Sequence, residues 1–118
     1  MNESLSQLHP NERSALKTFV ARLGAQLTTP VREVWLFGSK ARGDSEPDSD
    51  VDVLVILQDV DTRQVDAVHL IGARVSLEHD ILLNTHIFGY RHWSDMAHYR
   101  SPLWLHVQCD GILLSDSQ

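Results

Sequence analysis

The stretch from Val51 to Leu57, with the sequence VDVLVIL, most constrains how this chain folds. Successive side chains of a β-strand point to opposite faces of the sheet, and beyond Asp52 both faces of this stretch are apolar. A strand of this kind is stable only where other elements cover both of its faces. The chain therefore requires a sheet with secondary structure packed on each side.

The rest of the sequence supplies these covering elements. Helices are predicted where apolar residues recur at helical spacing, and strands where β-branched and aromatic residues cluster between turn formers. The predicted helices are Pro10 to about Leu27, residues 61 to about 78, and His92 to about Cys109. The other predicted strands are Val31–Phe37, Asp80–Phe88 and a short edge strand at Gly111–Leu114. The expected fold class is α/β or α+β, a small mixed β-sheet flanked by helices.

Length and composition exclude several classes of protein. The 118 residues amount to one domain spanning 1–118. A net charge of −6 argues against general nucleic-acid binding, which needs many cationic phosphate contacts. No apolar run approaches the ~20 residues of a membrane span, and the N-terminal residues have no signal-peptide pattern. A cytoplasmic protein is expected. The single cysteine, Cys109, excludes an intramolecular disulfide and is expected to be a buried small hydrophobe.

Two carboxylates stand at the start of the central strand. Asp50 and Asp52 are two residues apart, so their side chains share one face of the strand with Cα atoms about 6.5–7 Å apart. Such a pair is suited to Mg²⁺, which binds one or two carboxylates together with substrate phosphates and water. Two ions held about 3.5–4 Å apart stabilise both the entering and the leaving oxygen of a phosphoryl displacement.

A second polar group follows the preceding strand. Gly38 permits close approach of a phosphate to the backbone, and Ser39 offers a hydroxyl and the first amide groups of a predicted short helix, SKAR. Lys40 and Arg42 are near enough in sequence to neutralise phosphate charge, although exposed basic residues are more often simply solvated. The two groups together predict a site for a nucleoside triphosphate carried by Mg²⁺.

The combined motif resembles that of a known enzyme family. The motif is similar to the signature of the polymerase-β-type nucleotidyltransferases. It consists of Gly38-Ser39, ten intervening residues and then Asp50-Val51-Asp52. The longer segment LFGSKARGDSEPDSDVDVLVIL most resembles the minimal nucleotidyltransferase (MNT) branch. The resemblance implies the polymerase-β-like nucleotidyltransferase fold, ATP as substrate and two Mg²⁺ ions. It also implies attack of an acceptor hydroxyl on the α-phosphorus, with loss of pyrophosphate.

The resemblance assigns roles to individual residues. It implies that Gly38, Ser39 and Arg42 bind the nucleotide, and that Asp50 and Asp52 bind the metal ions. A third acidic ligand usually lies on the next core strand, and Asp80 is the candidate here. Because the interior of that predicted strand has no carboxylate, the rival interpretation is a degenerate site that binds nucleotide but transfers it poorly.

Histidines give a weaker signal. The chain has seven, but none shows the spacing of a zinc motif. Most are expected to be ordinary surface or half-buried residues. His79 and His86 lie near the predicted third strand, so a minor role in the site remains open for them.

Three functions follow from the resemblance. MNT proteins are often antitoxins paired with a HEPN-domain toxin, so the first hypothesis is transfer of AMP to such a partner protein. The second is a catalytically weak antitoxin that neutralises its partner by contact. The third is a small-molecule nucleotidyltransferase working as a homodimer with the acceptor at its interface.

Overall fold

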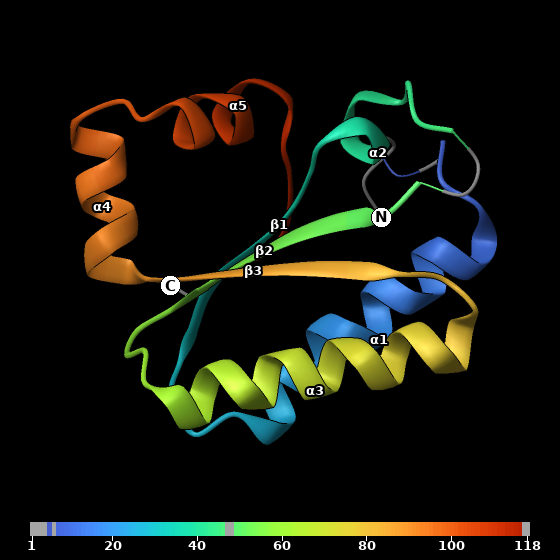
Figure 1. The fold of residues 1–118 in the computed structure, drawn as a ribbon, viewed down its shortest axis with the longest axis horizontal. Helices are drawn as coiled ribbons and strands as arrows, with labels where there is room; N and C mark the ends of the chain where they lie inside the picture. Colours follow the sequence, from blue (N-terminus) through green and yellow to red (C-terminus); the bar gives the residue numbers. More distant parts are fainter. Residues whose placement is uncertain (1–4, 6, 47–48, 117–118) are drawn as a thin grey trace.

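The structure is a computed structural model that describes residue 5, residues 7–46 and residues 49–116. It contains a four-stranded sheet and five helices in these parts of the chain (Figure 1). The strands are β1 (Val31–Phe37), β2 (Val51–Leu57), β3 (Leu83–Gly89) and β4 (Ile112–Asp116). The helices are α1 (Pro10–Gln26), α2 (Ser39–Arg42), α3 (Thr62–His79), α4 (Tyr90–His98) and α5 (Pro102–Asp110).

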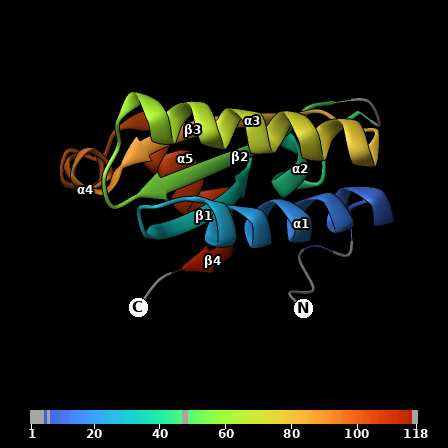
Figure 2. The same cartoon turned by 90° about the horizontal axis from the view of Figure 1, so that it is seen from below.

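The sheet is mixed, with the strand order β3-β2-β1-β4. β2 runs parallel to β3 and antiparallel to β1, and β1 is also antiparallel to β4. Helices α1 and α3 cover one face, while α4 and α5 lie on the other (Figures 1 and 2). The predicted mixed α/β architecture is confirmed, and β2 is the buried central strand that its two apolar faces require.

Alternate residues of β2 enter two separate hydrophobic cores. Val53 and Val55 pack with α1 and α3, whereas Leu54 and Ile56 pack with α4 and α5. All four side chains are fully buried, and burial of each contributes about 1.5–3 kcal/mol relative to exposure. The same alternation places Asp52 on the face of α4 and α5, at the end where β2 begins.

The third strand begins later than the sequence pattern indicates. Residue 80 is not part of a strand but the C-cap of α3, with left-handed backbone angles of φ 54° and ψ 46°. Aspartate tolerates this conformation better than most residues, and the Asp80 amide donates to the carbonyl of Ser76. The strand itself starts at Leu83, whose amide donates to the Ser76 hydroxyl at 3.0 Å. The predicted start of this strand at Asp80 was therefore wrong by three residues.

The predicted last helix is two helices. α4 ends at His98 and α5 starts at Pro102, with Arg100 at a φ of 53° between them. Proline cannot donate a helical backbone hydrogen bond and fits the first turn instead. The Ser101 hydroxyl caps the new helix by accepting from the amide of Trp104 at 3.3 Å.

The prediction of a buried Cys109 was also wrong, since this residue is exposed on α5.

One exposed ion pair joins the two helices of the first layer. The guanidinium of Arg22 on α1 donates two hydrogen bonds to Glu78 on α3, one of them at 2.7 Å. These hydrogen bonds lower the pKa of the Glu78 carboxyl below its usual value. The pair contributes its full stabilisation at pH values above the ordinary glutamate pKa. This contribution is lost as the pH falls through the lowered pKa of Glu78.

Within residues 5, 7–46 and 49–116, no helix combines the length and apolar character that a membrane crossing requires.

Candidate active site

The turn after β1 brings the two halves of the motif together. Phe37 ends β1 directly opposite Asp52 of β2, and Gly38 follows with a φ of 77° as the N-cap of α2. A Cβ atom on Gly38 would lie only 2.6 Å from Oδ2 of Asp52. Because a side chain there would clash and the positive φ disfavours other residues, glycine is required at this position. The backbone before Ser39 thus lies against the carboxylate of Asp52.

The carboxylates occupy the edge of the sheet where β2 begins. Asp50 is exposed and immediately precedes the strand, and the side chain of Asp52 is 26% exposed. The parallel register pairs Asp52 with Asn84 of β3, and the Asn84 amide donates to Oδ1 of Asp52 at 2.9 Å. One oxygen of Asp52 is therefore held by β3, and the other faces the Gly38 turn.

A histidine completes the surroundings of Asp52. His86 lies two residues beyond Asn84 on the same face of β3, with Nε2 3.7 Å from Oδ1 of Asp52. Its ring packs edge-on against Phe37, with a centroid separation of 5.2 Å. In the sequence, Asn84 is an interior position of the predicted third strand without a carboxylate, and His86 is a residue with an open minor role in the site. The signal that identifies them as neighbours of Asp52 is the β2–β3 register, which the strand patterns do not specify.

In the described part of the chain, no hydrogen bond or ion pair joins Asp80 to Asp50 or Asp52. Asp80 caps α3 four positions before Asn84, and it lines two hollows. One hollow is formed with residues at the start of α1 and with Ser49, and the other with residues along α3 and with Asn84. Neither has Asp50 or Asp52 in its lining. Its role as a metal ligand stays a prediction, and the register places Asn84 where a third carboxylate on the strand would stand.

The two cations of α2 have different surroundings. Nζ of Lys40 lies 2.7 Å from Oε2 of Glu12, and both side chains are almost fully buried. The other oxygen of Glu12 accepts from the amide of His9 at 2.8 Å. Lys40 is thus engaged in fastening α2 to α1. Arg42, in contrast, is exposed and pairs with Asp44 at 3.2 Å, and its contact with the nucleotide stays a prediction.

The donor set suits a divalent cation that a substrate helps to bind. In the described parts of the chain, no group of three or more His, Cys, Asp or Glu side chains is arranged to hold a metal ion. Mg²⁺ sites in phosphate-transfer enzymes commonly use one or two carboxylates and take their remaining oxygens from phosphates and water. The carboxylates of Asp50 and Asp52 are ligands of this type, and the Gly38 turn lies beside Asp52.

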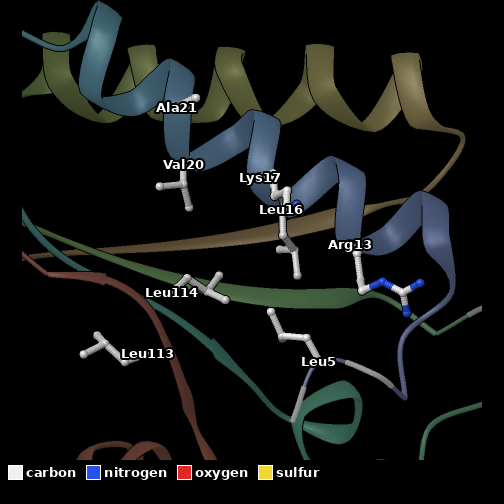
Figure 3. Close-up of a pocket in the computed structure, with 8 residues that line it drawn as sticks. All are labelled: Leu5, Arg13, Leu16, Lys17, Val20, Ala21, Leu113 and Leu114. Atoms are coloured by element: carbon white, nitrogen blue, oxygen red, sulfur yellow. The ribbon is translucent and has the colours of Figure 1, made fainter. Parts of the chain in front are cut away.

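The pocket between α1 and β4 is a separate feature. It has a volume of about 540 Å³, and the side chains of α1 face Leu113 and Leu114 across it (Figure 3). Among the described residues, its lining is apolar except for Arg13 and Lys17 and includes no carboxylate. This pocket cannot supply the metal ligands of a nucleotidyl transfer reaction, so the candidate site is the edge of the sheet at Gly38 and Asp52.

Comparison with known proteins places this site in a family. The model of the nucleotidyltransferase domain family matches residues 13–91, which include the Gly38 turn, both aspartates and β3. Two curated relatives come from Methanocaldococcus jannaschii. "Putative protein adenylyltransferase MJ0141" is 36% identical over 74 residues, covering 62% of this chain and 75% of the relative. "Putative protein adenylyltransferase MJ0604" is 35% identical, covering 63% of this chain and 70% of the relative.

Solved structures show the same fold. A toxin–antitoxin crystal structure with AMP-PNP has a TM-score of 0.57 at 19% identity, covering 85% of this chain and 73% of that one. A mutant of the toxin–antitoxin MntA–HpeT also has a TM-score of 0.57, at 20% identity, with 86% and 73% covered. The family match, the identity to the curated relatives and the geometry at Gly38 and Asp52 agree: the chain belongs to the nucleotidyltransferase domain family and is an enzyme of nucleotidyl transfer.

Proposed function

We propose that this nucleotidyltransferase transfers AMP from ATP to a hydroxyl group of a partner protein in a Mg²⁺-dependent reaction. The observation that carries the proposal is the 2.6 Å between the Cβ position of Gly38 and Oδ2 of Asp52. A phosphate bound at the Gly38–Ser39 turn would lie beside the carboxylate that binds the metal. A protein as acceptor is supported by the curated relatives, both of which carry the name protein adenylyltransferase.

Each residue of the site has a defined part in this reaction. Gly38 and Ser39 hold the β- and γ-phosphates, and Arg42 supplies a further positive charge once it leaves Asp44. Asp50 and Asp52 hold the metal, and Asn84 keeps the Asp52 carboxylate oriented through its hydrogen bond. When bound, two Mg²⁺ ions would neutralise the charge of the triphosphate and of the leaving pyrophosphate. Most of the rate enhancement comes from this positioning and charge stabilisation, since the protein forms no covalent bond.

The structural neighbours support a toxin as the partner. They are toxin–antitoxin structures, one with the ATP analogue AMP-PNP. We infer that this chain is the antitoxin of a pair with a HEPN-domain toxin, and that adenylylation of a toxin hydroxyl neutralises it. A second candidate function is neutralisation by contact alone. It is favoured by one observation, that the residue opposite Asp52 on β3 is the neutral Asn84.

Label transfer distinguishes the two functions. The chain is purified with a HEPN-domain partner, incubated with Mg²⁺ and ATP labelled on the α-phosphate, and compared with the Asp50→Asn variant. We expect label on the partner with the wild type and none with the variant. If the partner is bound and inhibited but never labelled, AMP transfer is excluded and the contact function is correct.

Ser39→Ala is expected to weaken ATP binding about tenfold, because one hydrogen bond to a charged phosphate contributes about 1.5 kcal/mol or more. The melting temperature should stay within about 2 °C, since Ser39 is half-buried at the start of a short helix. Calorimetric titration with ATP and Mg²⁺ measures the first effect. Ser14→Ala on the exposed side of α1 serves as the control. A large fall in melting temperature with unchanged ATP affinity would show that Ser39 is structural.

A further inference from the structure

His86 has an unsatisfied nitrogen beside the candidate metal site. Among the described residues, Nε2 of His86 is the one buried side-chain polar atom without a hydrogen-bond partner. Buried polar atoms are almost always paired, and leaving one unpaired destabilises the folded state. Such an exception in a native structure is explained by a bound water, by an ion or by a catalytic role of that atom.

The distance from Nε2 to Asp52 indicates what kind of partner this is. The separation of 3.7 Å from Oδ1 is too long for a direct hydrogen bond. Two ligand atoms that each lie about 2.1 Å from one metal ion are about 3.0 Å apart at a right angle and about 3.6 Å apart at 120°. The observed 3.7 Å is slightly above the 120° value, so the two atoms are near the spacing of two ligands of a single cation.

The surroundings hold His86 in this position. Its ring packs edge-on against Phe37 at 5.2 Å, and Phe37 is itself paired with Asp52 across the β1–β2 ladder. On the adjacent position of the same face, Asn84 donates to the same oxygen of Asp52. The strand next to β2 thus presents an amide and an imidazole to Asp52.

We propose that Nε2 of His86 is a ligand of the cation bound by Asp52, which gives the site a mixed oxygen and nitrogen ligand set. This inference rests on the proposed metal-dependent transfer and specifies its metal. Mg²⁺ prefers oxygen ligands, whereas an imidazole nitrogen increases affinity for first-row transition metals. The site therefore binds Mn²⁺ more tightly than Mg²⁺, and His86 contributes to that preference.

Pulsed electron paramagnetic resonance of bound Mn²⁺ tests the ligand directly. The protein is loaded with Mn²⁺ and inorganic tripolyphosphate, which fills the phosphate site and contains no nitrogen. We expect ¹⁴N modulation from one directly coordinated imidazole, replaced by the ¹⁵N pattern in wild-type protein grown with ¹⁵N-histidine. His86→Gln should abolish the modulation and lower Mn²⁺ affinity about tenfold or more, with less than about a threefold change for Mg²⁺.

His98→Gln is the matched control, because His98 lies at the end of α4 and its ring packs edge-on against the neighbouring Tyr99. It should leave the modulation and both affinities unchanged. Bound Mn²⁺ without ¹⁴N modulation in the wild type overturns the proposal even if His86→Gln fails to fold. Modulation that persists in a folded His86→Gln variant overturns it as well.

The outcomes separate this inference from the proposed function. If AMP is transferred and Mn²⁺ binds without nitrogen coordination, only the assignment of His86 is wrong. If neither Mn²⁺ nor Mg²⁺ binds with tripolyphosphate, both the metal-dependent transfer and the role of His86 are wrong. Asp52→Asn should remove metal binding in either case, since Asp52 is the ligand common to both proposals.

Discussion

Replacing Asp52 with asparagine is expected to reduce AMP transfer by about 10³-fold, an effect of the size seen when one strong transition-state contact is removed. Asn has the same shape as Asp but no negative charge, so the metal ion loses the ligand that lies against the Gly38 turn. Initial rates of label transfer from ATP at saturating Mg²⁺ measure the change. Asp50→Asn should have an effect of the same kind, because Asp50 precedes the same strand.

The fold of the Asp52→Asn variant should be retained. The Asp52 side chain is 26% exposed, and the amide of Asn84 still has an oxygen to donate to. The loss of repulsion with Asp50 should leave the free energy of unfolding unchanged or slightly higher. Asp59→Asn, an exposed acid beyond the other end of β2, is the control and should keep full activity. Wild-type rates in a folded Asp52→Asn variant would show that the site is elsewhere.

Lys40→Met is expected to lower the free energy of unfolding by about 3–5 kcal/mol, the effect typical of breaking a buried ion pair. The Lys40 and Glu12 side chains are only 4% and 6% exposed, and their charged atoms are 2.7 Å apart. Removing the ammonium leaves the Glu12 carboxylate buried without its cation. Urea unfolding followed by circular dichroism measures the change.

The double variant Glu12→Gln/Lys40→Met should recover much of that loss, because it removes both buried charges together. Arg42→Met is the matched control on the same short helix. Its partner Asp44 is exposed, so this substitution should change the free energy of unfolding by about 1 kcal/mol or less. Equal effects of the two single substitutions would contradict a special role for the buried pair.

The ion pair also matters for the site. Lys40 lies on α2 next to Ser39, and Glu12 lies in the first turn of α1. The pair therefore fixes the short helix that follows the Gly38 turn. We expect ATP affinity of Lys40→Met to fall even at temperatures where the variant is folded, whereas the double variant should bind ATP more tightly than the single one.

Features that depend on neighbouring residues were predictable from the sequence. β2 was identified as a central strand because its apolar run requires cover on both faces, whatever provides it. The Gly38–Ser39 turn and the aspartate pair were recognised because their spacing spans one loop between adjacent antiparallel strands. Ser101 and Pro102 mark the break between α4 and α5 locally, whereas the helix predicted from His92 to about Cys109 runs through it.

Features that depend on distant pairings were not predictable in the same way. Whether Asp80, Asn84 or His86 lies beside Asp52 depends on the register of two parallel strands that are separated by all of α3. A shift of two residues would have changed the neighbour without altering any local pattern. Lys40 and Glu12 are 28 positions apart in the chain and belong to different helices. The spacing of apolar residues in the sequence does not predict such a contact.

The sequence by itself determined the layered α/β architecture and the make-up of the Gly38–Asp52 motif, because both follow from local alternation, turn chemistry and spacing. Only the tertiary structure decided which side chains of β3 surround Asp52 and which cation of α2 is buried. The physical reason is that both features depend on strand register and helix packing. These bring together residues that are far apart in the sequence.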